Sequence, residues 1–227
     1  MGSSFSQAVD LIFKADSTLI NILITTLKMS FSSSILALLI GVPFGVLFGA
    51  TRFRGRKIFV VLNRTLMGLP PVVCGLLCFL MFCGVGPLRH MHLLYTIPGM
   101  VITQIILIVP IVVCSIEPYV SGIYPQIRET TKGLGLTGGR MLGLILNESR
   151  YQMVSTYLLA FSRAIAEVGA VSMVGGAIQF KTNVMTTAIM NYTNMGDFKM
   201  ALALGFILMG ISLVVNIAFS IMQKDAR

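Results

Sequence analysis

Long apolar segments, separated by short polar ones, place the strongest limit on how this chain folds. Five such segments occur, at about 19–50, 58–83, 93–117, 153–178 and 200–222. Each is at least as long as the roughly 20 residues that an α-helix needs to cross a bilayer. Because only helices and closed barrels satisfy their backbone polar groups there, the pattern predicts an all-α membrane protein with five transmembrane helices. We expect residues 1–227 to form a single transmembrane domain.

Few residues in the chain are charged, which separates it from soluble proteins. Hydrophobic residues make up 56% and charged residues 11% of the 227 positions, whereas soluble proteins carry about 25% charged residues. The formal net charge of +9 does not indicate a nucleic-acid partner, because the basic residues lie between the apolar segments. The first segment is too long for a cleavable signal peptide and lacks an A-x-A site, so we expect it to stay in the membrane.

The basic residues predict the orientation of the helices. Four cations follow the first segment directly, and such clusters stay in the cytoplasm. Outside the segments, ten Lys and Arg residues then fall on the cytoplasmic side and four on the outer side. The cytoplasmic ones are Arg52, Arg54, Arg56, Lys57, Arg128, Lys132, Arg140, Arg150, Lys224 and Arg227, and the outer ones are Lys14, Arg89, Lys181 and Lys199. This distribution predicts an N-terminus outside and a C-terminus inside the cell.

Three glycines lie four residues apart in the first segment. Gly41, Gly45 and Gly49 fall on one helical face, and small residues at that spacing let two helix backbones approach closely. The spacing favours packing against another helix of the same chain over a contact between subunits.

The second segment contains a break in its helix. Gly68 precedes Pro70 and Pro71, and the second proline lacks a backbone donor and keeps Pro70 out of helical geometry. Unwound backbone inside a bilayer is tolerated where it is buried in protein or lines a water-filled cavity. We therefore expect a break that lines a transport pathway, with a packing kink as the alternative. Pro110 predicts a second kink, in the third segment.

The fourth segment carries two opposite charges at helical spacing. Arg163 and Glu167 are four residues apart, so they are neighbours on one helix face. Ionisable residues inside a membrane usually face a bundle interior or an aqueous cavity. The pair is predicted to be either a structural latch or a direct participant in transport. Small residues around it, which allow tight packing or exposed backbone donors, include Gly169, Ser172, Gly175 and Gly176.

The sequence indicates neither a catalytic nor a metal site. The run Arg89-His90-Met91-His92 has two histidines without a carboxylate or cysteine beside them, which predicts an ordinary loop. The four cysteines lie in or at the ends of apolar segments and are expected to be buried hydrophobic residues. The chain lacks a G-x-x-x-x-G-K-[ST] phosphate loop, so we expect it not to be an enzyme and to bind no cofactor itself. Residues 179–199 are expected to form the longest outer loop.

The polar stretch 125–150 lies between the third and fourth segments. Its apolar residues follow one helical face at intervals of seven, seven and four, and they are Ile127, Leu134, Met141 and Ile145. Pro125 suits a first helical position. Gly138-Gly139 interrupts the stripe, and Thr137 suits the cap of a second helix. We expect a helix, a sharp bend and another helix at the membrane surface, with one face available to a partner.

This stretch resembles the E-A-A…G…I-x-L-P loop of membrane subunits of ATP-binding-cassette (ABC) importers that use a binding protein. Glu129 begins the match, Gly135 follows six residues later, and Ile145 ten residues after that. Thr130-Thr131 stands where the family has small alanines, and Asn147-Glu148 stands where it has Leu-Pro. The loop of this family presents a short helix to a cleft on an ATPase subunit.

Three further features resemble the branch of that family that imports molybdate, tungstate and sulfate. They are the run from Arg163 to Ala170 with its continuation Met173 to Gly176, the break from Pro70 to Gly75, and the overall size. The ending from Asn147 to Arg150 looks most like the tungstate permeases. Molybdate and sulfate remain alternative substrates.

The resemblance implies a type I importer-like permease fold, a homodimer, and a place in the cytoplasmic membrane of a prokaryote. It implies two cytoplasmic ATPase subunits, which hold the ATP and Mg²⁺, and an extracytoplasmic substrate-binding protein. The residues expected to couple to the ATPase are Arg128, Glu129, Thr130, Thr131, Lys132, Gly133, Gly135, Arg140 and Ile145. The residues expected to line the pathway are Gly68, Pro70, Pro71, Arg163, Glu167, Gly169, Ser172, Gly175 and Gly176.

Two other classes of function were weighed against this one. A channel or secondary transporter would use Arg163 and Glu167 as an ion relay, but it needs no elaborate cytoplasmic loop and often shows internal repeats. A membrane enzyme or scaffold is disfavoured because no nucleophile–base set occurs within the segments.

Overall fold

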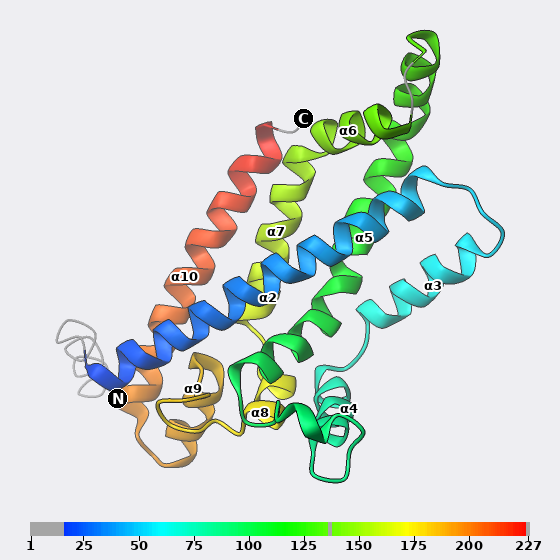
Figure 1. Cartoon of the computed structure of the whole chain (residues 1–227). Coiled ribbons are helices and arrows are strands. Elements are labelled where there is room, and N and C mark those ends of the chain that lie inside the picture. The colour runs from blue at the N-terminus through cyan, green and yellow to red at the C-terminus, as the bar shows by residue number, and fades with distance from the viewer. Residues whose placement is uncertain (1–15, 136–137, 226–227) are drawn as a thin grey trace.

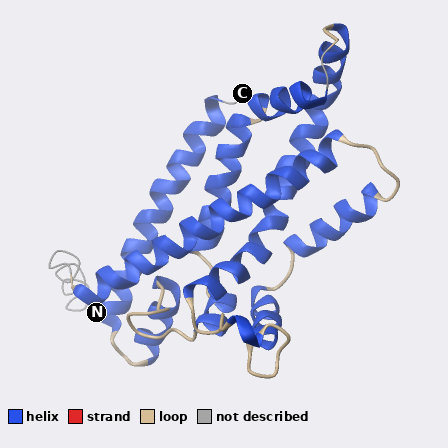
Figure 2. Ribbon diagram, in the orientation of Figure 1, coloured by secondary structure: helices blue, strands red, loops and turns tan. Residues whose placement is uncertain are grey.

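The computed structural model describes residues 16–135 and 138–225, and these residues fold into helices joined by short loops (Figure 2). The elements are α2 (Ser17–Ala50), α3 (Arg56–Met67), α4 (Pro71–Phe82), the 3-10 helix η1 (Arg89–Met91), α5 (Ile97–Gly133), α6 (Gly138–Glu148), α7 (Arg150–Ile165), α8 (Gly169–Gly175), α9 (Met185–Asn194) and α10 (Phe198–Asp225). The described residues contain no β-strand. The prediction of an all-α protein is confirmed.

Three helices are long and apolar enough to cross a membrane on their own. They are Ser17–Ala50, Ile97–Gly133 and Phe198–Ala218. Two bent pairs reach the required length together, namely α3 with α4 at 98° and α7 with α8 at 60°. The described part of the chain therefore provides three to five crossings. The start of α2 and the end of α10 lie at opposite ends of the bundle (Figure 1).

The core of the bundle is built around the contact between α2 and α5. Gly41, Gly45 and Gly49 of α2 lie against α5 so closely that a Cβ atom on any of them would overlap a side chain there. The side chains that it would meet are Val112 at 2.6 Å, Ile116 at 2.8 Å and Val120 at 2.7 Å. The prediction that these glycines pack within the subunit is confirmed. Close backbone approach of this kind increases van der Waals contact between membrane helices.

Helix α5 is longer than the sequence predicted. It begins at Ile97, passes Glu117 and continues to Gly133, so the polar residues after Glu117 extend the same helix. Pro125 was predicted to open a new helix, and this is wrong, because it lies inside α5 together with Pro110 and Pro118. Each proline removes one i→i−4 hydrogen bond, yet α5 extends through all three positions. The α-helix is continuous through Pro110.

The fourth apolar segment is broken, which the sequence did not predict. Helix α7 ends at Ile165, α8 begins at Gly169, and the two axes differ by 60°. Gly169 and Ala170, directly after the bend, permit it because they place little bulk around the turn.

Residues 179–199, predicted to be a loop, contain helix α9. Thr186 and Thr187 of this helix are buried, and the Met185 N–H donates to the Thr26 hydroxyl of α2 at 2.8 Å. No helix was predicted in this segment because its threonines make it look polar, whereas in the structure they are satisfied by internal hydrogen bonds.

Candidate functional site

The first candidate region lies where the two broken helices meet. Helix α3 ends at Met67 with Gly68 as its C-cap, Pro70 has φ −59° and ψ 126°, and α4 begins at Pro71. A Cβ atom on Gly75 of α4 would lie 2.7 Å from the Cα atom of Ala170 in α8. Helices α4 and α8 are therefore in close contact directly after their respective breaks.

The predicted pathway residues fall into two groups. Gly169 belongs with the first break, since a Cβ atom there would lie 2.7 Å from the Val72 side chain. Gly175 and Gly176 lie further along, where added Cβ atoms would meet Met100 and Tyr95. Ser172 lies between the groups, and its N–H donates to the Val168 carbonyl within α8. The structure brings Pro71 and Gly169 close together and places Gly176 apart from them.

Arg163 and Glu167 form the ion pair that their spacing predicts. The Arg163 Nη1 lies 2.7 Å from the Glu167 Oε2, and the Glu167 side chain is almost fully buried. The other carboxylate oxygen accepts the N–H of Ala170 at 3.3 Å, and the Glu167 carbonyl accepts the Thr186 hydroxyl at 2.8 Å. Glu167 thus joins α7, α8 and α9 at the 60° bend.

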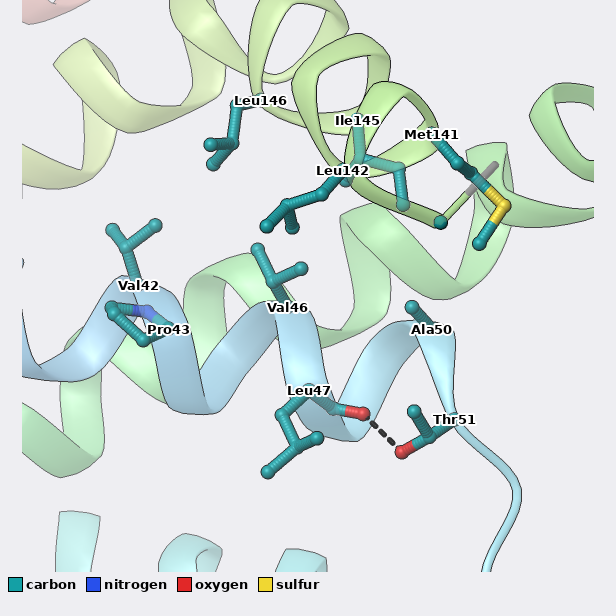
Figure 3. A pocket seen from close by; sticks show the side chains of 11 residues that line it. Val42, Pro43, Val46, Leu47, Ala50, Thr51, Met141, Leu142, Ile145 and Leu146 are labelled. Carbon is teal, nitrogen blue, oxygen red and sulfur yellow. Dashed lines mark hydrogen bonds between the residues drawn. The ribbon is translucent and has the colours of Figure 1, made fainter. Parts of the chain in front are cut away.

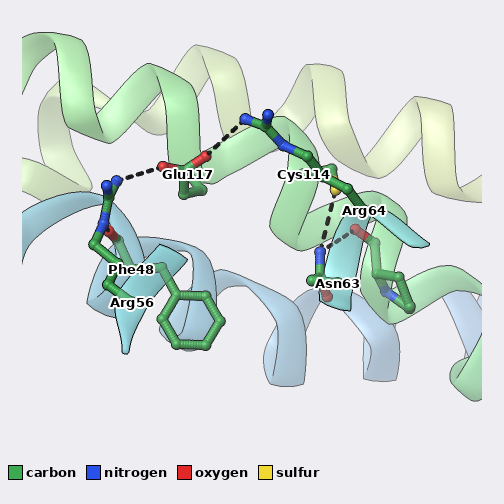
Figure 4. Close-up of polar contacts among 7 residues, drawn as sticks. Phe48, Arg56, Asn63, Arg64, Cys114 and Glu117 are labelled. Carbon is green, nitrogen blue, oxygen red and sulfur yellow. Dashed lines mark hydrogen bonds and ion pairs between the residues drawn. The ribbon is translucent and has the colours of Figure 1, made fainter. Parts of the chain in front are cut away.

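A second charged cluster, which the sequence analysis missed, joins α3 to α5. Glu117 lies inside α5 with its side chain 8% exposed, and it faces Arg56 at 2.5 Å and Arg64 at 3.7 Å (Figure 4). The Asn63 amide donates to the Pro110 carbonyl at 3.0 Å and approaches the Cys114 thiol at 3.1 Å (Figure 4). Two charged residues in the apolar segments could have indicated this cluster: Glu117 at the end of the third segment and Arg64 inside the second.

The second candidate region is the helical hairpin made by the end of α5 and by α6. Gly135 has φ +64°, in the left-handed region, and its N–H donates to the Lys132 carbonyl at 3.2 Å. Such a glycine after the last helical residues is a common helix stop. Thr137, the predicted cap, lies outside the described residues, and α6 begins at Gly138. The predicted order of helix, bend and helix is present, although the first helix is the end of α5.

The hairpin projects from one end of the bundle (Figure 1). Most predicted coupling residues on it are exposed. The exposed ones are Arg128, Glu129, Thr130, Lys132, Gly133, Gly135 and Arg140. Thr131 is buried and donates to the Ile127 carbonyl at 2.8 Å. Ile145 is also buried, at 1% exposure, in the core that contains Val46 and Val112. Ile145 thus fixes α6 to the bundle rather than offering itself to a partner.

An apolar cavity of about 370 Å³ separates part of α6 from the end of α2. Its walls come from Val42, Val46 and Leu47 of α2 and from Leu142 and Leu146 of α6 (Figure 3). Packing between the two helices is incomplete there.

The described residues contain no group of three or more His, Cys, Asp or Glu side chains that could hold a metal ion. The four cysteines are free, with Cys74 and Cys78 buried and Cys83 and Cys114 half-buried. Arg89, His90 and His92 surround an open hollow in the loop after α4.

Comparison with known proteins gives these two regions a context. Residues 41–227 match the family described as binding-protein-dependent transport system inner membrane component. The chain is 32% identical over 225 residues to the tungstate uptake system permease protein TupB of Peptoclostridium acidaminophilum, which covers 99% of both chains. It is 34% identical over 212 residues to the TupB protein of Campylobacter jejuni, covering 93% of this chain and 89% of the relative.

A solved structure shares the fold. A chain of the MetNI methionine ABC transporter in inward-facing conformations superposes with a TM-score of 0.72 and covers 92% of this chain and 96% of its own length. At 16% sequence identity, this likeness bears on the fold alone.

Proposed function

The chain belongs to the family of binding-protein-dependent transport system inner membrane components, and we propose that it carries tungstate through the cytoplasmic membrane as the permease of an ATP-driven importer. The observation that carries the proposal is the likeness to a tungstate uptake permease over 99% of both chains. A likeness of this extent leaves no large part of the chain for a different activity.

The α5–α6 hairpin is proposed to dock into an ATPase subunit. Five of the predicted coupling residues with charged or hydroxyl side chains are exposed on the projecting hairpin, where a partner can reach them, and they are Arg128, Glu129, Thr130, Lys132 and Arg140. Because α5 is one helix from Ile97 to Gly133, force on the hairpin is transmitted directly into the bundle. Ile145 ties α6 to α2 and α5 through the core, so the hairpin cannot move without them. ATP and Mg²⁺ would be bound and hydrolysed on that partner.

The meeting point of α4 and α8 is proposed as part of the anion pathway. Helix α4 begins at Pro71 inside an apolar region, and the N-terminal end of a helix carries partial positive charge. Broken helices of this kind offer backbone N–H groups to anionic substrates in other transporters. A tetrahedral dianion would be held by such groups and by hydroxyls such as that of Ser172. The ion pair between Arg163 and Glu167 would hold α7 and α8 at their 60° bend.

A homodimer is proposed because α3 and α4 leave wide apolar surfaces. None of the residues of α3 is buried, and Val61, Leu62 and Met67 are more than half exposed. A second copy of the chain packed on this side would enclose a pathway between the two sets of broken helices. An extracytoplasmic binding protein would deliver the anion to it.

Transport by the complete complex tests this proposal. The permease, its ATPase and its binding protein are reconstituted in proteoliposomes, and uptake of tungstate is followed with ATP and with a non-hydrolysable analogue. We expect ATP-dependent uptake that excess tungstate inhibits more strongly than excess molybdate or sulfate. A stronger effect of molybdate or sulfate would reassign the substrate, and equal uptake without ATP would favour a channel or secondary transporter.

One variant separates coupling from folding in the same assay. Gly135→Asp places a negative charge on the exposed turn, where no atom lies within 4 Å of the new Cβ. We expect it to remain in the membrane but to lose uptake and ATPase stimulation. Normal uptake would remove the hairpin from the mechanism.

A further inference from the structure

A basic hollow lies where α2 ends and α3 begins. It has a volume of about 550 Å³ and is lined by Arg52, Arg56 and Lys57, together with Ser121 of α5. The remaining lining residues are Gly49, Phe53, Gly55 and Ile58. Three cations thus surround one concave space.

The charges around this hollow are not balanced. Arg56 donates from Nε to the Phe48 carbonyl and from Nη2 to Glu117, each at 2.5 Å (Figure 4). A guanidinium has five N–H donors, so most of those on Arg56 are left for a ligand. Among the described residues, no ion pair involves Arg52 or Lys57. Glu117 pairs with both Arg56 and Arg64 and offsets at most one charge, which leaves an excess of positive charge around the hollow.

Apolar side chains adjoin the basic ones. Ile58, which lines the hollow, is 72% exposed, and Phe59 is 51% exposed. The Phe59 ring also stacks on that of Phe48, with centroids 6.1 Å apart. In a membrane protein such exposed residues beside a cation cluster meet the region where lipid headgroups give way to acyl chains.

We propose that this hollow binds the phosphate of an anionic phospholipid headgroup. Cations arranged around one space hold a tetrahedral phosphate by charge-assisted hydrogen bonds, and basic pockets between membrane helices bind such headgroups. A free phosphate ion can accept hydrogen bonds from the same donors, but it makes no apolar contact with Ile58 and Phe59. The bound lipid would also join α3 to α2, and α3 has no buried residue of its own.

Lipid binding to the purified full-length chain tests the proposal. Native mass spectrometry measures the dissociation constant for phosphatidylglycerol and for phosphatidylcholine with the same acyl chains. Arg52→Gln and Lys57→Gln each remove one cation from the hollow. Arg54→Gln is the matched control, because Arg54 lies in the same loop and is exposed but does not line the hollow.

We expect a preference for phosphatidylglycerol that weakens about fivefold in Arg52→Gln and in Lys57→Gln, and less than about twofold in Arg54→Gln. Equal weakening in all three variants would show general attraction to a basic loop and would overturn the site. Absence of a preference for the anionic lipid would overturn it as well.

Inorganic phosphate, added as a competitor, distinguishes a lipid headgroup from a free phosphate ion as the ligand of the hollow. We expect millimolar phosphate to leave lipid binding unchanged, because the acyl chains contribute to it. If phosphate displaces the lipid and itself binds the wild-type chain more tightly than Arg52→Gln, the hollow is an oxyanion site and the lipid assignment is wrong.

Discussion

The Arg56 guanidinium at the start of α3 lies 2.5 Å from the Glu117 carboxylate inside α5, and this ion pair joins α3, which has no buried residue, to one of the core helices. The Arg56 side chain is 26% exposed and that of Glu117 is 8% exposed. Arg64 approaches the same carboxylate from further along α3, at 3.7 Å. Glu117 therefore holds α3 at two points along its length.

Loss of the Glu117 charge should release α3. In Glu117→Gln, Arg56 is left without its counter-ion in a partly buried place, and removal of one partner from such a pair costs about 3 kcal/mol. We expect a lower melting temperature in detergent, followed by far-UV circular dichroism because the chain has no Trp. Arg64→Gln should cost much less, since the Arg64 side chain is 64% exposed. Equal losses in both variants would contradict this assignment of roles.

The glycines of α2 should tolerate no added methyl group. In Gly45→Ala, the new Cβ would lie 2.8 Å from Ile116, so α2 and α5 must separate. We expect destabilisation of about 1–3 kcal/mol from this overpacking. Gly122→Ala in α5 is the control, because no atom lies within 4 Å of its new Cβ and Ala is the better helix former. A stable Gly45→Ala variant would mean that the two helices are not in contact as described.

Features within one helix could be predicted from the sequence, whereas contacts between distant helices could not. The Pro70–Pro71 break and the glycine face of α2 depend on neighbouring residues, and both are present in the structure. The apolar segments likewise correspond to three to five crossings in the described residues. Arg163 and Glu167 are four residues apart, so their contact follows from helix geometry alone.

Contacts between distant segments were missed for a physical reason. Arg56 and Glu117 are 61 residues apart, and nothing in the sequence fixes the register of α3 against α5. The same holds for the Met185 N–H, whose acceptor Thr26 lies 159 residues away. Helix α9 was read as a loop because that partner could not be foreseen. Burial of Ile145 was also missed, since an apolar face on a helix does not indicate whether it packs against the same chain or against a partner.

Two serines one turn apart on α2 should respond in opposite ways to alanine. The Ser33 hydroxyl donates to the Gln104 Oε1 at 2.6 Å, and the Gln104 amide donates to the Ala164 carbonyl at 2.8 Å. Ser33→Ala leaves a buried acceptor unpaired, which costs about 1–3 kcal/mol. The Ser30 hydroxyl is buried and has no hydrogen-bond partner. Ser30→Ala should therefore be neutral or stabilising. Circular dichroism melts of both variants provide the comparison, and a larger loss for Ser30→Ala would contradict it.

The Arg163–Glu167 pair should behave as a latch in a double-mutant cycle. Arg163→Gln leaves the buried Glu167 charge uncompensated, at a cost of about 3 kcal/mol. The double variant Arg163→Gln/Glu167→Gln removes both charges, and its amide oxygen can still accept the Ala170 N–H. We expect it to be more stable than Arg163→Gln alone and to retain uptake. If stability returns but uptake does not, the charges take part in transport themselves.

Exchange of the two charges is a weaker rescue than neutralisation. An arginine at position 167 cannot accept the Ala170 N–H, whereas the native carboxylate does so at 3.3 Å. The swapped variant Arg163→Glu/Glu167→Arg should therefore recover part of the stability that either single neutralisation loses, and less than the double glutamine variant. Full recovery would show that the bond to Ala170 contributes little.

The left-handed turn at Gly135 should decide whether the hairpin couples to an ATPase. Gly135 has φ +64° and open space around its Cα, so a substitution there tests backbone conformation without a steric clash. Val strongly disfavours this region, and L-residues in general pay about 1–2 kcal/mol there, whereas Asn visits it readily. In the reconstituted complex we expect Gly135→Val to lower ATPase stimulation about tenfold and Gly135→Asn to stay within about twofold of wild type. Both variants have similar size and should insert equally, as membrane fractionation can verify. Equal activity of the two would mean that the turn conformation is not used in coupling, even if the hairpin itself is.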